Sequence, residues 1–179
     1  GPEFRSGLAE VVKAGIIGDP GLFDELAGDG PESLSEMISR SVRVKIELVQ
    51  RDPFENGDRA WLNLGHTFGH ALELHSGFTL RHGDAVAVGM VAAATLSERM
   101  GACGPGMAGH IEEVLARLGL PARYPFDPDT VIAAMATDKK RRGRTLRFVV
   151  IEQIGKVAVA EDVPGDAVRA ALAAVQSSA

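Results

Sequence analysis

Residues 85–96 read Ala85-Val-Ala-Val-Gly89-Met-Val-Ala-Ala-Ala-Thr-Leu96 and form the longest apolar stretch of the chain. Gly89 interrupts the stretch, which is also too short to cross a bilayer, since a membrane-spanning helix needs about 20 apolar residues. The pattern predicts a buried helix over residues 83–100. We therefore expect a soluble protein with this helix in its core and without a membrane partner.

Further segments with helical spacing lie on both sides of this helix, separated by breaks rich in Pro and Gly. They cover residues 8–18, 21–28, 33–51, 60–76, 106–119, 128–137 and about 164–175. Only residues 146–151 and 156–160 have the composition of strands, and Gly155 predicts a hairpin between them. The predicted fold class is mainly α: a multi-helix domain with one small β-hairpin near the C-terminus.

Two strands cannot form the doubly wound sheet of a dinucleotide-binding domain, so this chain is expected to lack one. Gly104-Pro-Gly106-Met-Ala-Gly109 matches G-x-G-x-x-G literally. It follows a helical segment rather than a strand, however, and predicts a loop in which Pro105 opens the next helix.

Length and composition are typical of one globular domain with a sizeable core. The chain has 179 residues, 19 Lys and Arg against 24 Asp and Glu, a net charge of −5 and a single cysteine, Cys103. One cysteine excludes an internal disulfide framework, and a reducing, cytoplasmic setting is expected. The acidic balance argues against a general nucleic-acid binder. Residues 1–4 resemble a remnant of cloning, which leaves residues 5–179 as the predicted domain.

Lys45 does not fit a simply packed helix. The apolar residues of segment 33–51 form one helical arc, and Lys45 projects near its middle, on the same face as Ile38, Val42 and Val49. A buried ammonium without a partner is costly. Lys45 is therefore expected to reach solvent, to pair with an acidic group or to serve a binding site.

Glu10 and Lys13 are the only charges in a segment, residues 7–17, that is apolar on nearly every side. Because they are three residues apart, they can form an ion pair along an exposed helix that is worth a few tenths of a kcal/mol. In a buried helix, a metal or substrate site becomes the favoured interpretation.

A stripe of polar residues runs along residues 59–73. On a continuous helix Arg59, Asn63, His66 and His70 would fall within about 60° of arc. Two histidines four residues apart can point into one metal site, and His82 follows shortly after them, although satisfied core histidines show the same spacing. Because Thr67 follows His66, the zinc-protease pattern H-E-x-x-H is absent.

Gly65 and Gly69 lie within this segment, where each glycine weakens a helix by about 1 kcal/mol relative to alanine. They indicate that another group approaches the backbone closely.

The run Asp138-Lys139-Lys140-Arg141-Arg142-Gly143-Arg144 has three interpretations: a solvated charged face, an anion site for a phosphorylated small molecule, or a nucleic-acid patch. The absence of interleaved aromatic residues makes nucleic acid the weakest of the three.

Five separated motifs in this order resemble 3-dehydroquinate synthase. They are Gly7-Leu-Ala-Glu10-Val-Val-Lys13, Lys45 with Asp52-Pro-Phe-Glu55, Arg59-x-x-Leu-Asn63-Leu-Gly-His66-Thr-Phe-Gly-His70-Ala-Leu-Glu73, His82-Gly-Asp84-Ala-Val-Ala-Val-Gly-Met90 and Asp138-Lys139-Lys140. The resemblance runs from about Arg5 to the last strand. It corresponds to the helical C-terminal half of that enzyme, and the half that holds the nucleotide-binding sheet is not matched.

The resemblance implies a Zn²⁺ or Co²⁺ site formed by Glu10, His66 and His82, with a coordination position left open for substrate oxygens. It implies that Lys45, Arg59 and Asn63 bind the substrate's carboxylate and hydroxyls. It also places Lys13, His70 and Lys139 around the phosphate and the proton-transfer path, with His70 as the proton shuttle. Whether Lys139 or Lys140 faces the substrate stays open.

The implied reaction converts 3-deoxy-D-arabino-heptulosonate 7-phosphate to 3-dehydroquinate in the shikimate pathway. Bound NAD transiently oxidises a ring hydroxyl, phosphate is eliminated, the ketone is reduced again, and an internal aldol reaction closes the ring. The implied partners are the NAD-binding half of the enzyme and, in the full-length form, a second subunit. An isolated half is expected to lack turnover.

Two alternatives remain open. Other sugar-phosphate cyclases, such as 2-deoxy-scyllo-inosose synthase and the valiolone synthases, share these motifs, although Arg59 with Asn63 favours a substrate that carries a carboxylate. The second alternative is a helical metal- or anion-binding module without catalysis.

Overall fold

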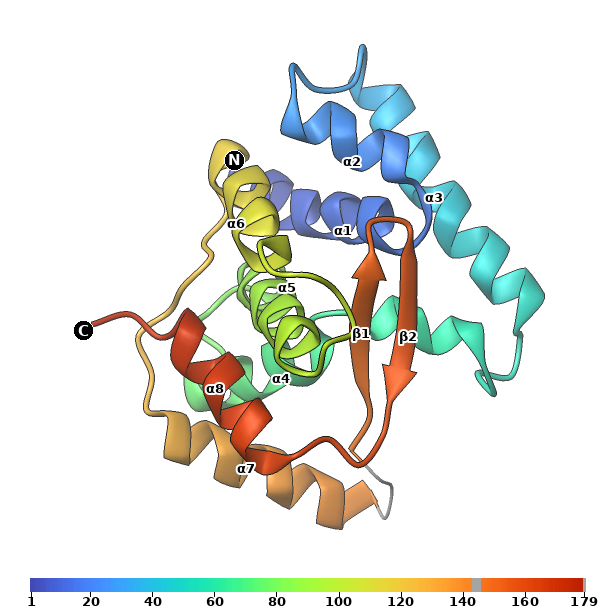
Figure 1. The fold of residues 1–179 in the computed structure, drawn as a ribbon. Helices are drawn as coiled ribbons and strands as arrows, with labels where there is room; N and C mark the ends of the chain where they lie inside the picture. The colour runs from blue at the N-terminus through green and yellow to red at the C-terminus, as the bar shows by residue number, and fades with distance from the viewer. Residues whose placement is uncertain (143–145, 179) are drawn as a thin grey trace.

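The computed structural model describes residues 1–142 and 146–178, with the backbone alone at residues 137–142. The described helices are α1 (Pro2–Gly18), α2 (Pro20–Ala27), α3 (Leu34–Arg51), α4 (His66–His75), α5 (His82–Arg99), α6 (Met107–Arg117), α7 (Pro128–Arg142) and α8 (Gly165–Val175), with a 3₁₀ helix at Asp58–Asn63. Strands β1 (Phe148–Gln153) and β2 (Lys156–Ala160) form one antiparallel hairpin (Figure 1). The predicted fold class is confirmed.

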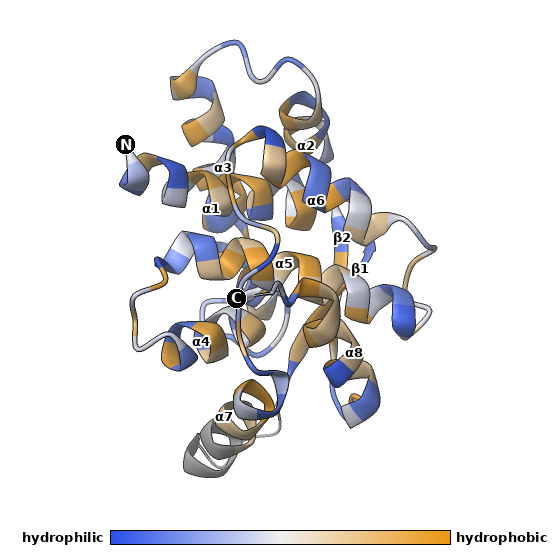
Figure 2. Cartoon of the chain, turned by 90° about the vertical axis from the view of Figure 1, so that its left-hand side faces the viewer, coloured by the Kyte–Doolittle hydropathy of each residue, from blue (hydrophilic) through white to orange (hydrophobic). Residues whose placement is uncertain are grey.

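Helix α5 is the centre of the core, as its apolar sequence predicts. Its residues from Gly83 to Ala94 are all buried, and α1, α4, α6, α8 and β1 pack around it (Figure 2). Ser97, the buried polar residue near its end, accepts a hydrogen bond from the backbone N–H of Ile151 and so joins α5 to β1. In the described part of the chain, no helix is both long enough and apolar enough to cross a membrane.

The close approach indicated by Gly65 and Gly69 is confirmed, and the approaching group is the backbone of α5. A Cβ atom on Gly69 would lie 3.1 Å from the carbonyl oxygen of Ala85. A Cβ atom on Gly89 would lie only 2.0 Å from the carbonyl oxygen of Gly65. The glycines therefore allow α4 and α5 to touch through their main chains.

The hairpin is tied to the helices by its turn. Gly155 has a φ of +86°, which suits glycine, and its N–H donates to the carbonyl of Ile16 in α1 over 2.8 Å. Phe148 to Ile151 are buried, and β1 pairs with β2 from Phe148 opposite Ala160 to Gln153 opposite Lys156. Residues 156–160 form a strand as predicted, whereas β1 begins two residues later than expected.

The expected continuous helix over residues 60–76 is wrong. The chain forms a 3₁₀ helix to Asn63 and turns at Gly65, which has a φ of +78°, before α4 begins at His66. Local spacing cannot reveal this break, because the turn depends on the close packing of Gly65 against Met90.

Three smaller differences concern helix ends. Residues 2–4, expected to lie outside the domain, form the first turn of α1. Helix α6 begins at Met107 after Gly106, which has a φ of +101°, so Pro105 does not open it. Helix α7 continues to Arg142, beyond the expected end at residue 137.

The prediction that Lys45 lies in a buried arc is also wrong. Helix α3 buries only Met37, Val44 and Leu48, and Lys45 is exposed. Leu34, Ile38, Val42 and Ile46 are each about half exposed, because α3 packs through one narrow side on α1 and the 3₁₀ helix. Lys45 is thus exposed, and it also lines the cavity described below, so two of the three outcomes expected for it, exposure to solvent and a place at a binding site, both apply.

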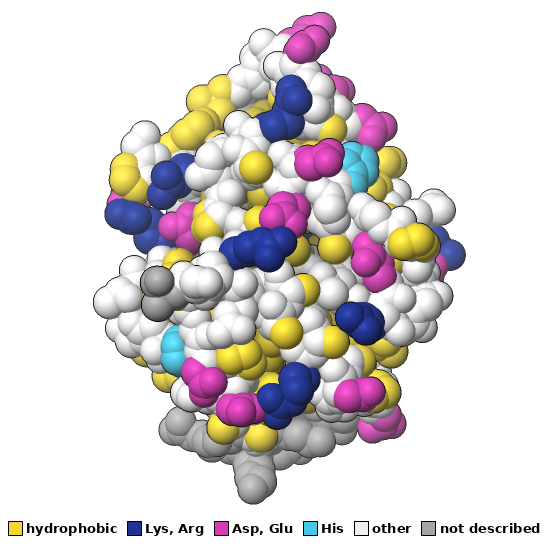
Figure 3. Space-filling view, turned by 60° about the vertical axis from the view of Figure 1, so that its left-hand side comes forward, with side chains coloured by type: hydrophobic (Ala, Val, Ile, Leu, Met, Phe, Trp, Pro, Cys, Tyr) yellow, Lys and Arg dark blue, Asp and Glu magenta, His cyan; other side chains and the backbone are white. Residues whose placement is uncertain are grey.

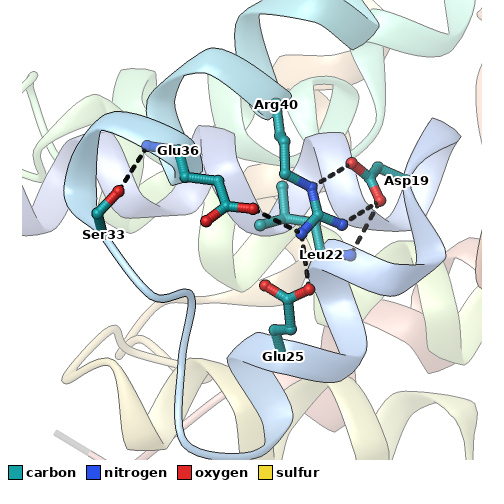
Figure 4. Close-up of polar contacts among 6 residues, drawn as sticks. All are labelled: Asp19, Leu22, Glu25, Ser33, Glu36 and Arg40. Carbon is teal, nitrogen blue, oxygen red and sulfur yellow. Dashed lines mark hydrogen bonds and ion pairs between the residues drawn. The ribbon is translucent and has the colours of Figure 1, made fainter.

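Arg40 links α3 to the start of α2 (Figure 4). Its guanidinium donates to both oxygens of Asp19, at 2.8 and 2.7 Å, and to Glu25 at 2.7 Å. Asp19 also caps α2 by accepting from the N–H of Leu22. The hydrogen bonds from Arg40 hold the pKa of Asp19 below its ordinary value.

Arg40→Met is expected to lower the free energy of unfolding at pH 7 by about 1–3 kcal/mol, the usual worth of charge-assisted hydrogen bonds. Because the pKa of Asp19 is depressed in the folded chain, this stabilisation is present above the unfolded pKa of about 4 and is lost as the pH falls through the folded pKa. Urea unfolding of both proteins between pH 3 and pH 7 measures this. Arg51→Met, which removes the exposed pair with Asp58, is the control and should change little. An unchanged difference between wild type and Arg40→Met across this range would contradict the linkage.

Candidate metal and substrate site

The predicted site residues converge on one cavity of about 360 Å³ between α1, α3, the 3₁₀ helix and the start of α5. It is lined by Glu10, Lys13, Lys45, Glu55, Arg59, Leu62, Asn63, His66 and His82. The lining residues come from α1, α3, the 3₁₀ helix, α4 and α5 and from the loop that carries Glu55, and they combine carboxylates, imidazoles and cations. His70, also expected at the site, does not line this cavity.

Glu10, His66 and His82 can hold a metal ion together. Each offers one ligand atom, and these atoms lie within 4.8 Å of one another. The Oε1 atom of Glu10 is 3.9 Å from Nε2 of His66, inside the span of about 4 Å that two atoms bound to one zinc ion can reach. This Oε1 atom is buried and has no hydrogen-bond partner among the described residues. A bound cation would compensate its negative charge.

Lys13 is the deepest charge of the site. Its residue is 5% exposed, and its ammonium lies 2.6 Å from Oε2 of Glu10, so the expected ion pair is present in a buried helix. Burial lowers the pKa of Lys13, although Glu10 opposes the shift. Burial acts to raise the pKa of Glu10, but Lys13, His66 and His82 outweigh it and the pKa lies below its usual range. Glu10 is therefore an anion whose second oxygen faces the histidines.

The ring of His66 is held in a defined orientation. Its Nδ1 atom is 3.2 Å from the carbonyl oxygen of Leu64, while Nε2 faces Glu10. Burial, followed by the charge of Lys13, lowers the pKa of His66 to about 4. The ring is therefore neutral at pH 7, the form that binds metal ions.

Asp52 organises the loop that carries Arg59. The carboxylate of Asp52 accepts from the backbone N–H groups of Asn56, Gly57 and Arg59, and these bonds lower its pKa. One guanidinium N–H of Arg59 donates to the carbonyl of Pro53 over 2.7 Å, and its other donors are available to a ligand. The loop thus fixes the base of Arg59 at the mouth of the cavity.

A second cavity of about 580 Å³ adjoins the first, and Glu55, Asn63 and His66 line both. His70 faces this second cavity, with Glu73, Phe78 and Arg147 among its other lining residues. The ring centroids of His66 and His70 are 5.3 Å apart, and those of His70 and His82 are 6.1 Å apart. The side chain of Lys139 lies outside the described residues, so its expected position has no structural test.

Sequence reasoning assigned no role to Glu55, Thr67, Glu73 or Arg147, all of which line the second cavity. Asn63 donates to Glu55 over 3.3 Å, and Thr67 donates to the backbone carbonyl of Arg147. Only Glu73 carried a signal, since it falls on the face of α4 that holds His66 and His70. Glu55 and Arg147 lie outside helices and strands and so have no helical period, while Thr67 lies in α4 next to His66.

Two solved synthases have a fold similar to that of this chain. The 2-epi-5-epi-valiolone synthase of Streptomyces hygroscopicus, with NAD⁺ and Zn²⁺ bound, aligns over 96% of this chain and 50% of its own with a TM-score of 0.84 and 29% identity. A 2-deoxy-scyllo-inosose synthase with carbaglucose-6-phosphate, NAD⁺ and Co²⁺ aligns over 94% of this chain and 50% of its own, with a TM-score of 0.80 and 23% identity. The latter likeness concerns the fold alone.

Residues 7–141 match the family model of the 3-dehydroquinate synthase C-terminal domain, and the chain belongs to this family. The 3-dehydroquinate synthase of Cereibacter sphaeroides is 42% identical over 185 residues, 95% of this chain and 50% of that protein. The 3-dehydroquinate synthase of Xanthomonas campestris is 44% identical over 186 residues, 96% of this chain and 50% of that protein. The chain thus spans about half the length of the curated relatives it matches.

Proposed function

We propose that this chain supplies the metal- and substrate-binding half of an enzyme that converts 3-deoxy-D-arabino-heptulosonate 7-phosphate to 3-dehydroquinate, with elimination of phosphate. The observation that carries the proposal is the cavity in which Lys45 and Arg59 face Glu10, His66 and His82. A carboxylate on the substrate has cationic partners there, beside a candidate metal site. The curated relatives with this name, at 42% and 44% identity, support the same substrate.

Glu10, His66 and His82 would hold Zn²⁺ or Co²⁺. When bound, the metal would supply Lewis-acid chemistry at the substrate hydroxyls, and NAD would supply an acceptor for hydride. Lys13 keeps Glu10 ionised through their ion pair, so the site needs no proton release at Glu10 before a cation binds. The related synthases that hold NAD⁺ with Zn²⁺ or Co²⁺ support this choice of cofactors.

Arg59 and Asn63 would orient the substrate. A guanidinium binds a carboxylate through two parallel hydrogen bonds, which fixes the plane of that group as well as its position. The amide of Asn63 lies between the two cavities and can donate to a hydroxyl in either. Lys45, exposed on α3, adds charge at the entrance.

His70 would move protons in the second cavity, because an imidazole exchanges protons near neutral pH and its ring lies beside those of His66 and His82. Lys13 and Lys139 would balance the charge of the phosphate. Lys13 faces the same cavity as Arg59, so the phosphate and the carboxylate would enter a space with cations on two sides.

The NAD site would lie mainly in an N-terminal half like that of the relatives, and the assembled enzyme would be a cytoplasmic homodimer. The nucleic-acid alternative concerned residues 138–144, whose side chains lie outside the described residues; on the face shown in Figure 3, acidic and basic side chains are interspersed. A cyclase for a substrate without a carboxylate remains the second candidate, favoured by the TM-score of 0.84 with the valiolone synthase.

Calorimetric titration of the zinc-loaded chain tests the substrate assignment. Arg59→Ala is expected to weaken binding of 3-deoxy-D-arabino-heptulosonate 7-phosphate by about 10- to 100-fold, the worth of a hydrogen-bonded ion pair of about 1.5–3 kcal/mol. Binding of glucose 6-phosphate, which has no carboxylate, should change far less. Arg99→Ala, at the opposite end of α5 from His82, is the control. Equal weakening of both ligands by Arg59→Ala would contradict a carboxylate contact.

Turnover provides the second test. The chain alone should release no phosphate from the substrate in the presence of NAD and zinc. Adding the N-terminal half of the Cereibacter sphaeroides relative should restore phosphate release together with 3-dehydroquinate. Phosphate release by the chain alone would contradict the proposed division of labour, and a metal-binding mixture without activity would favour the non-catalytic module.

A further inference from the structure

Glu73 is hydrogen-bonded to a proposed metal ligand, although neither the proposed ligand set nor the proposed substrate contacts assign it a role. It lies on α4, and its side chain is 15% exposed. Its Oε1 atom is 3.1 Å from Nδ1 of His82. His82 is the first residue of α5, and its side chain is 50% exposed. The ring centroids of His66 and His70 lie 5.1 and 6.1 Å from that of His82, and the hydrogen bond to Glu73 fixes the direction in which Nδ1 of His82 points.

The hydrogen bond sets which nitrogen of His82 carries the proton. An ionised carboxylate only accepts hydrogen bonds, and a neutral imidazole has one N–H and one nitrogen with a free lone pair. With Nδ1–H donating to Glu73, the lone pair of His82 is on Nε2, the atom left for a cation.

His66 is oriented in the same way by a different acceptor. Its Nδ1 atom is 3.2 Å from the carbonyl oxygen of Leu64, and its Nε2 atom faces Glu10. Metal-binding histidines usually donate their second N–H to a carboxylate or a carbonyl, which fixes the tautomer and the ring plane. Each of the two histidines has one such partner.

Glu73 has a competing interpretation, because His70, Glu73 and His82 also offer ligand atoms within 4.8 Å of one another. In that arrangement Glu73 would itself bind an ion. The hydrogen-bond inventory argues against it: Oε1 of Glu73 already accepts from His82, whereas Oε1 of Glu10 is buried with no donor. The unmet acceptor belongs to the set with Glu10.

We propose that Glu73 is a positioning residue that holds His82 as the Nδ1–H tautomer, with Nε2 directed to the metal site of Glu10 and His66. The role of Glu73 in metal binding rests on the proposed function, because it requires that Glu10, His66 and His82 bind the metal. The tautomer itself is a property of the chain without metal.

Nitrogen-15 NMR of the imidazoles in the metal-free chain tests the tautomer directly. His82 should be protonated at Nδ1 in the wild type and in Glu73→Gln, whose amide oxygen also accepts, and should lose this preference in Glu73→Leu. His66 is an internal control, because Leu64 and not Glu73 accepts its proton. Glu112→Leu is the matched control. It removes the exposed ion pair between Glu112 on α6 and Arg123, and it should leave the tautomers of His66 and His82 unchanged.

Zinc affinity, measured by competition with a chromophoric chelator, gives the second readout. Glu73→Leu should weaken zinc binding by about 10- to 100-fold, the usual effect of losing a partner of a metal ligand, while Glu73→Gln should stay within a few-fold of wild type. Equal loss in both variants, or a stoichiometry that falls from two zinc ions to one, would identify Glu73 as a ligand and overturn the proposal. A mixed tautomer of His82 in the metal-free wild type would also overturn it. Failure of the wild type to bind zinc, with the tautomer as expected, would count against the proposed function alone.

Discussion

Gly89→Ala is expected to lower the free energy of unfolding by more than about 3 kcal/mol, the upper range for overpacking a core. The added Cβ atom would lie 2.0 Å from the carbonyl oxygen of Gly65 and 3.1 Å from the backbone nitrogen of Gly69. Both are main-chain atoms, so no change of rotamer relieves the contact. Helices α4 and α5 would have to separate, which opens the middle of the core. Urea unfolding measures the change.

Gly109→Ala is the matched control for this substitution. Gly109 lies inside α6, and a Cβ atom there would have no atom within 4 Å. The same replacement should therefore stabilise the chain by about 0.5–1 kcal/mol, the helix propensity of alanine over glycine. A Gly89→Ala protein within about 1 kcal/mol of wild type would show that the contact between α4 and α5 can give way. Any folded Gly89→Ala protein should also bind zinc less tightly, because α4 carries His66 and α5 carries His82.

His66→Ala is expected to weaken zinc binding more than about a hundredfold, beyond the 10- to 100-fold loss typical of a residue that only supports a ligand. His66 lies between the other two proposed ligands, with Nε2 at 3.9 Å from Glu10 and its ring centroid 5.1 Å from that of His82. Elemental analysis of the wild type should find about one zinc ion per chain. Zinc at a hundred times its dissociation constant should stabilise the wild type by about 2.7 kcal/mol, and His66→Ala should lose most of that gain.

His110→Ala is the control, since His110 packs edge-on against Phe23, with ring centroids 5.2 Å apart, away from the site. It should bind zinc as the wild type does. Zinc affinity unchanged by His66→Ala, or reduced as much by His110→Ala, would contradict the proposed ligand set.

Much of this molecule follows from local patterns in its sequence. Helix α5 is buried because residues 85–96 offer almost no polar side chain to solvent, and residues 156–160 form a strand of the hairpin as their composition predicted. Seven of the proposed site residues share one cavity, as their motifs predicted: Glu10, Lys13, Lys45, Arg59, Asn63, His66 and His82. The helix and strand predictions succeed because spacing and residue type are properties of short segments, whereas the roles of the site residues were expected from the resemblance of their motifs to a known family.

Other features depend on contacts between distant segments. The break at Gly65 exists because α5 packs against the backbone there. The residues next to Gly65 in sequence do not indicate that α5 is the element it contacts. Lys45 is exposed because α3 buries only one narrow side, and the position of α1 determines which side that is. The hydrogen bond from His82 to Glu73 likewise needs the turn between α4 and α5.

The sequence by itself therefore determined the fold class, the helix that forms the core and the set of candidate site residues, whereas the tertiary structure alone decided how those residues face one another. The physical reason is the sequence distance over which each effect acts. Helix periodicity and residue type act over a few neighbouring residues, but the orientation of a metal-binding imidazole depends on an acceptor brought beside it by the packing of two helices.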